Sequence, residues 1–139
     1  MAKILIVDDE KGLRLGTKRL LESEGFEVDT AENGKEGIEK GISSEFDIAV
    51  IDLKMPDIEG LEVLQKIKSI FPNTVCFIAT AYASIETAIE ATRLGAYNYI
   101  PKPFTPEEIL HQLDIGYKHR LLVLESEKLR KERESNLLE

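Results

Sequence analysis

The sequence predicts a doubly wound α/β sandwich, in which helices cover both faces of a parallel sheet. Short apolar runs rich in β-branched residues alternate five times with segments whose apolar residues recur at helical spacing. Parallel strands require crossovers of this kind, and the crossovers are right-handed, so helices come to lie on both faces of the sheet. Several of the apolar runs also end in a carboxylate or another polar residue, which is typical of strands whose carboxyl ends face a ligand.

The first three predicted strands differ in how continuous their apolar runs are. Residues 3–7 and 47–51 are almost uninterrupted, as expected of strands that are buried on both faces. Residues 26–30 alternate between apolar and polar side chains, which predicts a half-exposed strand near an edge of the sheet. One helix separates the first two of these strands, and a shorter helix over residues 35–42 follows the turn at Asn33.

The second half of the chain continues the alternation, and two polar residues mark where its helices begin. Residues 74–81 and 97–100 are predicted as the fourth and fifth strands. Asp57 is expected to cap the helix before the fourth strand, and Ser84 the helix after it. Glu86 lies only two residues after Ser84, so a full capping box is not expected. Five strands in this arrangement favour the flavodoxin-like order 2-1-3-4-5.

The last predicted helix is longer than a compact domain needs. It has proline in its first turn at Pro106, contains only Gly116 as a breaker, and is expected to extend to about residue 134. Its distal half alternates in charge, which indicates either a solvated, fraying helix or one that pairs with a partner helix. We expect residues 1–117 to form one domain and residues 118–139 a linker helix that is a candidate for a coiled coil. The stripe expected to pair in a homodimer is Leu110, Tyr117, Leu121 and Leu124.

Composition excludes several classes of function. A chain of 139 residues with 42% hydrophobic and 32% charged residues can form one soluble domain with an addition. The formal net charge of -8 disfavours direct nucleic-acid binding by this chain. No apolar run reaches the length of a membrane span, so we expect a cytoplasmic protein. The single cysteine, Cys76, lies in an apolar run and is expected to be a small buried hydrophobe.

Polar residues gather where the predicted strands end. Asp8 and Asp9 follow the first strand, Asp52 the third, Thr80 ends the fourth, and Lys102 follows the fifth. The carboxyl ends of parallel strands share one edge, where three carboxylates repel unless one is protonated or a cation binds. Oxygen ligands without histidine or cysteine favour Mg²⁺, and a lysine and a hydroxyl would hold phosphoryl oxygens. The set predicts phosphoryl transfer onto a carboxylate, with Asp52 as the nucleophile.

These motifs, in this order, resemble the receiver domains of two-component response regulators. The resemblance covers residues 3 to about 118, and the segment from Tyr82 to Tyr97 looks most like receivers of sigma-54-dependent (nitrogen-regulator-type) transcription activators. The motifs are Val7-Asp8-Asp9-Glu10, Ile51-Asp52-Leu53-Lys54-Met55-Pro56, Thr80-Ala81 and Tyr99-Ile100-Pro101-Lys102-Pro103-Phe104.

The resemblance implies a role for each residue of the site. Asp52 would accept a phosphoryl group from a phosphohistidine on a sensor histidine kinase. Asp9, Asp52 and the backbone carbonyl of Lys54 would ligate Mg²⁺, with Asp8 acting largely through water. Lys102 would pair with the phosphoryl group, and the peptide bond that follows Lys102 is expected to be cis.

The resemblance also implies a conformational output. Thr80 and Tyr99 would be the switch pair, although alternation along the fifth strand predicts that Tyr97 and Tyr99 face the same side. Lys54 and Tyr82 occupy positions thought to set the lifetime of the phosphate. In the receivers of sigma-54-dependent activators, a helix leads on to an ATPase domain and a DNA-binding domain, so such domains are expected downstream of this segment.

Two rival classes of function fit the residues less well. A stand-alone phosphatase with an aspartyl intermediate usually has a second acid two residues after the nucleophile, where this chain has Lys54. A flavodoxin-like cofactor-binding module needs a Ser-, Thr- or Gly-rich loop after the first strand, where Asp8-Asp9 would repel a phosphate. His111 and His119 lie eight residues apart without other ligands, so they are not expected to bind a metal. We therefore expect a phosphorylation-switched signalling domain that turns over no separate substrate.

Overall fold

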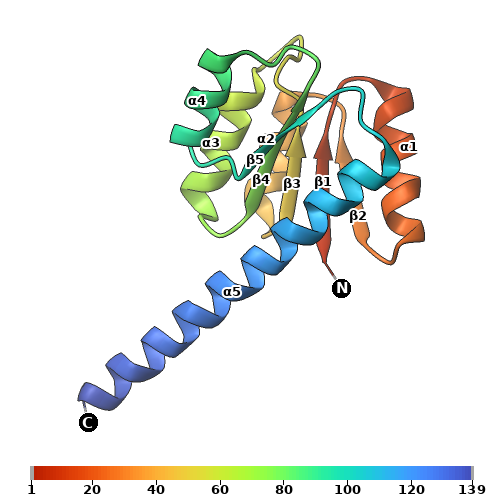
Figure 1. Ribbon diagram of the computed structural model, residues 1–139. Helices are drawn as coiled ribbons and strands as arrows, with labels where there is room; N and C mark the ends of the chain where they lie inside the picture. Colours follow the sequence, from red (N-terminus) through yellow and green to blue (C-terminus); the bar gives the residue numbers. More distant parts are fainter. Residues whose placement is uncertain (1, 139) are drawn as a thin grey trace.

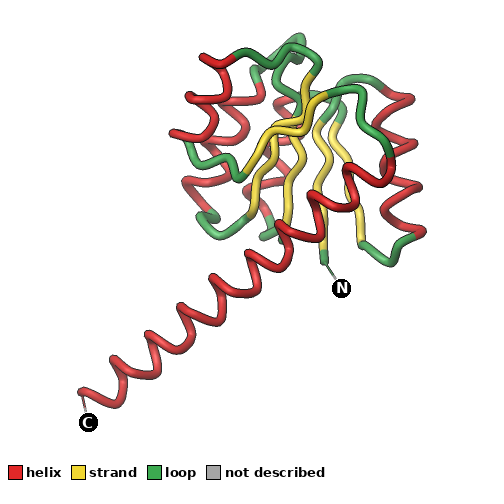
Figure 2. Tube along the Cα trace, viewed as in Figure 1, coloured by secondary structure: helices red, strands yellow, loops and turns green. Residues whose placement is uncertain are grey.

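The computed structural model describes residues 2–138 and contains a five-stranded parallel sheet in the order β2-β1-β3-β4-β5, between two layers of helices (Figures 1 and 2). The fold class and strand order predicted from the sequence are therefore confirmed. In chain order the elements are β1 Lys3–Val7, α1 Lys11–Ser23, β2 Glu27–Ala31, α2 Gly34–Ser43, β3 Ile48–Ile51, α3 Gly60–Ile70, β4 Val75–Thr80, α4 Ile85–Arg93, β5 Asn98–Pro101 and α5 Pro106–Leu138.

The sheet separates two hydrophobic cores, each made by one face of the strands and the helices that cover it. Helices α2, α3 and α4 cover one face, and α1 and α5 cover the other (Figure 1). The parallel ladder places Val7 beside both Ala31 and Ile51, and Ile51 beside Ile78. Because the strands end in register, the residues that follow them meet at one edge of the sheet.

The prediction that Asp57 caps the helix that follows it in the sequence, α3, is wrong. Helix α3 begins at Gly60, and within residues 2–138 the side chain of its N-cap residue, Glu59, makes no capping hydrogen bond. The Asp57 carboxylate instead accepts hydrogen bonds from the backbone N–H groups of Gly34 and Lys35, both at 2.9 Å, at the start of α2. Asp57 does cap a helix, but the helix is a spatial neighbour rather than the one that follows it in the sequence.

The start of α4 also differs from the expectation. The Ser84 hydroxyl accepts a hydrogen bond from the Thr87 N–H at 3.1 Å, and the Thr87 hydroxyl accepts one from the Ser84 N–H at 3.1 Å. This reciprocal pair is a full capping box. The prediction that the box is absent is wrong, because a threonine hydroxyl takes the place of the usual Glu or Gln side chain.

The two tyrosines near β5 face opposite sides of the sheet, which contradicts the alternation argument. Tyr97 precedes the strand and packs edge-on against Phe77 and beside His119 on the side of α5, with ring-centroid distances of 5.6 and 4.8 Å. Tyr99 packs against the core on the side of α3 and α4. Alternation did not apply because β5 begins only at Asn98.

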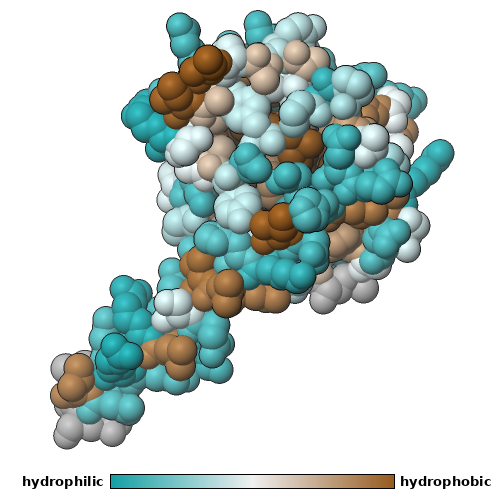
Figure 3. Space-filling view, in the orientation of Figure 1, coloured by the Kyte–Doolittle hydropathy of each residue, from teal (hydrophilic) through white to brown (hydrophobic). Residues whose placement is uncertain are grey.

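Helix α5 begins against the sheet and then projects away from it (Figure 1). Ile109 and Leu113 are fully buried, whereas polar and apolar side chains are interspersed on the projecting part (Figure 3). In the predicted dimer stripe, Leu110 and Tyr117 pack against the chain's own core, while Leu121 is 47% exposed. Among residues 2–138, no helix is both long enough and apolar enough to span a membrane.

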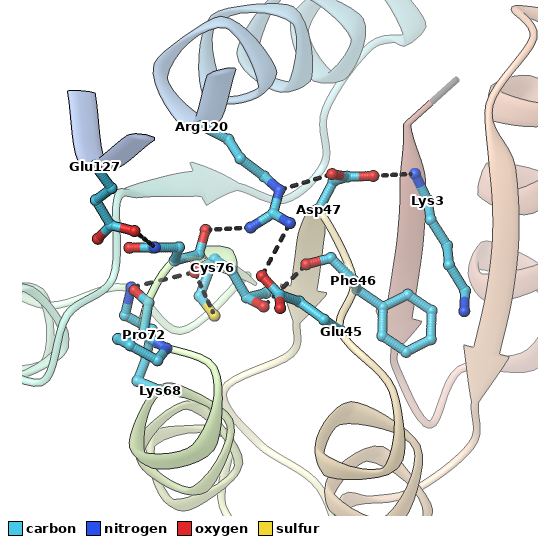
Figure 4. Close-up of polar contacts among 11 residues, drawn as sticks. Lys3, Glu45, Phe46, Asp47, Lys68, Pro72, Cys76, Arg120 and Glu127 are labelled. Carbon is cyan, nitrogen blue, oxygen red and sulfur yellow. Dashed lines mark hydrogen bonds and ion pairs between the residues drawn. The ribbon is translucent and has the colours of Figure 1, made fainter. Parts of the chain in front are cut away.

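Arg120 anchors the middle of α5 to the amino-terminal edge of the sheet (Figure 4). Its Nε donates to Asp47 Oδ1 at 2.6 Å, its Nη2 to Glu45 Oε2 at 3.0 Å and its Nη1 to the Asn73 carbonyl at 2.8 Å. The other oxygen of Asp47 accepts the Lys3 N–H at 2.7 Å. Every nitrogen of this buried guanidinium is therefore hydrogen-bonded, and the cluster joins α5, β1 and the segments that precede β3 and β4.

Candidate functional site

The backbone of the sheet brings the candidate residues to one edge. The Asp52 N–H donates to the Val7 carbonyl at 2.8 Å, which sets Asp52 beside the end of β1, where Asp8 begins. The Lys102 N–H donates to the Thr80 carbonyl at 3.0 Å, which sets Lys102 beside the end of β4. The residues that the sequence predicted to meet are therefore positioned by hydrogen bonds that continue the strand ladders.

Three carboxylates lie together at this edge. Asp8, Asp9 and Asp52 each offer an oxygen, and these oxygens lie within 4.8 Å of one another. Asp8 and Asp52 are only 5% and 8% exposed, whereas Asp9 is exposed. Buried carboxylates at such distances repel strongly unless a cation is present.

Lys102 supplies one cation to the cluster. Its Nζ lies 2.7 Å from Asp8 Oδ2 and 3.5 Å from Asp52 Oδ2. The Lys102–Pro103 peptide bond is cis, as expected. Among residues 2–138, the three carboxylates outnumber the one ammonium that pairs with members of the cluster, so the cluster remains short of positive charge.

The surroundings of Asp52 change the pKa of its carboxyl group. The pKa of Asp52 is raised to about 6, mainly by burial and also by the charges of Asp8 and Asp9, while the charge of Lys102 acts to lower it. A hydrogen bond from the backbone of Lys54 also lowers this pKa. The protein therefore holds Asp52 poised between its neutral and ionised forms at a pH not far below neutrality.

The donor set fits a hard divalent cation. All three side chains offer carboxylate oxygens, and Mg²⁺ is bound in proteins by one or two carboxylates together with waters and phosphate oxygens. One oxygen of Asp8 already accepts the Glu10 N–H at 2.9 Å, and the other faces Lys102. Asp9 and Asp52 therefore have more free acceptor capacity for a metal than Asp8 has.

The cleft that leads to Asp52 has a volume of about 380 Å³. Lys54 and Tyr82 stand at its rim, with the Lys54 ammonium 5.4 Å from the centroid of the Tyr82 ring. This cation–π contact places an exposed side-chain pair beside the cleft that leads to the Asp52 carboxylate. The cleft is lined by Asp9, Glu10, Asp52, Lys54, Ala81, Tyr82 and Lys102.

In the part of the chain that the structure describes, neither of the two predicted switch residues is hydrogen-bonded to the carboxylates of the site. The Thr80 hydroxyl, which is buried, accepts the Tyr82 N–H at 3.0 Å. The Tyr99 hydroxyl is buried, and within residues 2–138 it has no hydrogen-bond partner. A buried hydroxyl without a hydrogen-bond partner raises the free energy of the folded state. A rearrangement that gives the Tyr99 hydroxyl a partner is therefore favourable.

Sequence reasoning missed Arg14. This residue of α1 is only 8% exposed, and its Nη1 donates to the Asp8 carbonyl at 2.9 Å. This hydrogen bond ties helix α1 to the backbone of Asp8, the first carboxylate of the cluster. An arginine in an amphipathic helix usually faces solvent, so its position in the sequence gave no signal of this role.

The fold and the site define a class of protein: a doubly wound domain with an acidic carboxyl edge suited to a cation and a phosphoryl group. The family model of the response regulator receiver domain matches residues 4–114. The regulatory protein AtoC of Escherichia coli is 36% identical over 107 residues, which are 77% of this chain and 23% of AtoC.

Solved structures agree. A CheY-like receiver domain protein from Methanospirillum hungatei is 36% identical, with a TM-score of 0.84 over 86% of this chain and 96% of that one. NtrX from Brucella abortus, solved in complex with ADP, is 28% identical, with a TM-score of 0.85 over 92% of this chain and 30% of that one. The chain belongs to the response regulator receiver domain family and takes part in phosphorylation-based signalling. It spans about half or less of the length of the first curated relatives it matches.

Proposed function

We propose that this chain is the phosphorylation switch of a transcription activator, and that Asp52 accepts a phosphoryl group from a histidine kinase. The observation that carries the proposal is the position of Asp52, buried at the base of an acidic cleft with the Lys102 ammonium 3.5 Å away. No product leaves the domain in this reaction except the spent donor and, later, inorganic phosphate. The chain therefore modifies itself and is not an enzyme with a separate substrate.

The chemistry follows from the residues at the edge of the sheet. An oxygen of Asp52 attacks the phosphorus atom of the phosphohistidine, the new O–P bond forms, and the P–N bond to the imidazole breaks. Asp9, Asp52 and the carbonyl of Lys54 would hold Mg²⁺, with Asp8 acting through water. When bound, Mg²⁺ would neutralise charge on the phosphoryl oxygens. Ionised Asp52 is the reactive form, and a nearby cation favours that form.

The position of Lys102 allows its ammonium to move toward a phosphoryl group on Asp52. In the unphosphorylated chain its ammonium is closer to Asp8, at 2.7 Å, than to Asp52, at 3.5 Å. A phosphoryl group on Asp52 brings strong acceptor oxygens and about −1.5 to −2 charges to the cleft. The ammonium therefore has a stronger partner on the side of Asp52 after transfer and shifts toward it.

The same charge would recruit the Thr80 hydroxyl away from Tyr82 and change the packing of Tyr99. The element that responds is the segment after Thr80 together with α4, whose Ile85 and Ile89 are 81% and 63% exposed. Thr80→Ala should still be phosphorylated, but the amide NMR shifts of α4 should respond less than in the wild type. A full wild-type response in Thr80→Ala would place the switch elsewhere.

The output of the switch is proposed to pass through α5. We propose that residues 1–117 form the receiver and that residues 118–139 form a linker helix that pairs with a second copy. Because Leu110 and Tyr117 contact their own core, the exposed Leu121 and its neighbour Leu124 would make the main contact. Leu121→Glu should weaken self-association in sedimentation experiments, while the control Leu122→Glu should not. The reverse result would move the contact to another stripe of the helix.

Downstream of this segment we propose an ATPase domain and a DNA-binding domain. The proposal is supported by the short share of AtoC and of NtrX that the chain spans, 23% and 30%, and by the ADP bound to NtrX. A kinase with a cytoplasmic phosphohistidine would be the partner, so the chain would act in the cytoplasm. The net charge of -8 leaves nucleic-acid contact to the other domains.

The assignment of Asp52 is tested by phosphorylation from a small-molecule donor. Wild-type protein incubated with acetyl phosphate and Mg²⁺ should gain one phosphoryl group by intact mass, and Asp52→Asn should gain none. The control Asp114→Asn removes an exposed acid on α5 and should be labelled like the wild type. Equal labelling of Asp52→Asn would exclude Asp52 as the acceptor.

A further inference from the structure

The loop between β3 and α3 holds two groups of the proposed site, the Asp52 carboxylate and the Lys54 carbonyl. Its near end is fixed to the start of α3, because the Gly60 N–H donates to the Leu53 carbonyl at 2.8 Å. Gly60 also approaches Asp52 so closely that a Cβ at this position would overlap the Asp52 carbonyl oxygen. The near end is therefore held by a hydrogen bond and by close packing of the backbone.

The far end of the loop is fixed to a different element, helix α2. Asp57 Oδ1 accepts the Gly34 N–H and Oδ2 accepts the Lys35 N–H, both at 2.9 Å. These are N–H groups of the first turn of α2, which have no acceptor within the helix. The two hydrogen bonds also lower the pKa of Asp57, with the Lys35 N–H as the larger cause, so the carboxylate is ionised near neutral pH.

Packing adds to this contact. A Cβ on Gly34 would lie 2.6 Å from Ile58 Cβ, so the absence of a side chain at Gly34 lets the loop lie directly on α2. Ile58 and Met55 both pack against the core on that face of the sheet. Helix α2 has a cap of its own as well, because the Asn33 side chain accepts the Glu36 N–H at 2.8 Å. Helix α2 therefore keeps an N-terminal cap, the Asn33 side chain, even without the Asp57 carboxylate.

We propose that Asp57 is a positioning residue for the phosphorylation site, and that its carboxylate clamps the loop to α2 so that the Lys54 carbonyl stays where the cation binds. The inference rests on the proposed function and deepens it. Lys54 is exposed and lies between the two anchors of the loop, at Gly60–Leu53 and at Asp57. Mg²⁺ requires near-ideal octahedral ligand geometry, so a displaced carbonyl weakens binding more than it would for a flexible cation such as Ca²⁺.

The clamp also explains why an acid at this position is useful. An ionised carboxylate has two oxygens and can accept both N–H groups at once, whereas an amide offers only one acceptor oxygen. Charge-assisted hydrogen bonds to a helix N-terminus are stronger than neutral ones. Asp57→Asn is therefore expected to keep part of the clamp, and Asp57→Ala to lose it.

The first test measures the clamp in metal-free protein. Hydrogen exchange at the Gly34 and Lys35 amides should be at least about tenfold faster in Asp57→Ala than in the wild type, and intermediate in Asp57→Asn. The matched control is Asn33→Ala, which removes the other cap of the same helix without touching the loop. It should speed exchange at Glu36 and leave the amides of Lys54, Met55 and Asp57 unchanged.

The second test measures what the clamp does for the cation. The Mg²⁺ affinity of Asp57→Ala, measured by calorimetry, should be about tenfold weaker than that of the wild type, as found when residues that orient metal ligands are removed. The rate of phosphorylation by acetyl phosphate should fall at low Mg²⁺ and recover at saturating Mg²⁺. Asp57→Asn should lie between the two, and Asn33→Ala should bind Mg²⁺ like the wild type.

Two results would overturn the positioning role: wild-type Mg²⁺ affinity in Asp57→Ala, or an equal loss of affinity in Asn33→Ala, which would mean that stability of α2 alone matters. Neither result affects the assignment of Asp52, because wild-type protein would still be labelled and Asp52→Asn would not. A wild-type chain that is not labelled at all would instead reject the proposed function, and with it the need for a clamp.

Discussion

The two edges of the sheet each hold a cluster of charged residues, and the clusters differ in how completely their polar groups are paired by hydrogen bonds within the chain. At the amino edge, the Arg120 guanidinium meets two carboxylates and a backbone carbonyl, and each of its nitrogens is hydrogen-bonded. At the carboxyl edge, three carboxylates lie together, and the ammonium of Lys102 pairs with two of them, Asp8 and Asp52. The guanidinium at the amino edge has all its hydrogen-bond partners without a ligand, whereas the carboxylates at the carboxyl edge need an added cation to balance their charge.

This difference separates a structural use of charge from a functional one. A buried guanidinium with all its partners present resists change, because removing any one leaves another buried group unpaired. A cluster with an excess of like charge lowers the stability of the fold and responds strongly to protons, cations or a phosphoryl group. Substitutions in the two clusters should therefore change stability in opposite directions.

The largest effect is expected at the amino edge. Arg120→Met should lower the free energy of unfolding by about 2–4 kcal/mol, because Asp47 and Glu45 lose their shared cation. Urea unfolding followed by circular dichroism measures the change. The control Arg93→Met breaks an ion pair with Glu90 on the surface of α4 and should change stability little. An equal loss of unfolding free energy in both variants would mean that the buried Arg120 cluster stabilises the fold no more than a surface ion pair does.

A smaller effect, of opposite sign, is expected from Asp52 as the pH changes. Its pKa in the folded chain, about 6, is above the ordinary value near 4, so between these values the folded state binds more protons than the unfolded state. Ionised Asp52 therefore destabilises the metal-free fold above pH 6, and this penalty disappears as the pH falls through 6 toward 4. Relative to wild type, Asp52→Asn should be about 1–2 kcal/mol more stable at pH 7.

Urea unfolding in a metal chelator, at pH 7 and at pH 5, measures this difference between the two proteins. The advantage of Asp52→Asn should shrink at pH 5, because wild-type Asp52 then takes up its proton. It should also shrink at pH 7 when Mg²⁺ is added, because the cation relieves the repulsion in the wild type. A constant difference under all three conditions would argue that the charge of Asp52 does not cause it.

The smallest of these effects is expected at Asp9, the exposed member of the acidic cluster. Asp9→Asn should stabilise the metal-free chain by on the order of 1 kcal/mol, since it removes repulsion from Asp8 and Asp52 at a distance of several ångströms. The same change should abolish most of the stabilisation by Mg²⁺ in thermal melts. Glu22→Gln, which removes one exposed charge on α1, is the control. Full stabilisation by Mg²⁺ in Asp9→Asn would remove Asp9 from the proposed ligands.

The residues that meet at the carboxyl edge of the sheet could be predicted because short patterns in the sequence specify them. Asp8 and Asp52 each follow an apolar run directly, and a parallel ladder brings the ends of such runs together whatever the details of packing. The long α5 was also predictable, since periodicity and the absence of breakers act over neighbouring residues. In both cases the sequence by itself determined the result, because each pattern spans only a few residues and has one geometric consequence.

The tertiary structure alone decided which distant groups meet. Asp57 caps α2 rather than α3, across 22 and 23 residues of sequence, and Arg120 reaches carboxylates 73 and 75 residues away. Tyr97 packs against His119 of α5, on the opposite side of the sheet from Tyr99, because β5 starts one residue later than the alternation argument assumed. Such pairings depend on the rotation of each helix about its axis and on where a strand starts. Those quantities are set when the two cores pack, and local periodicity does not encode them.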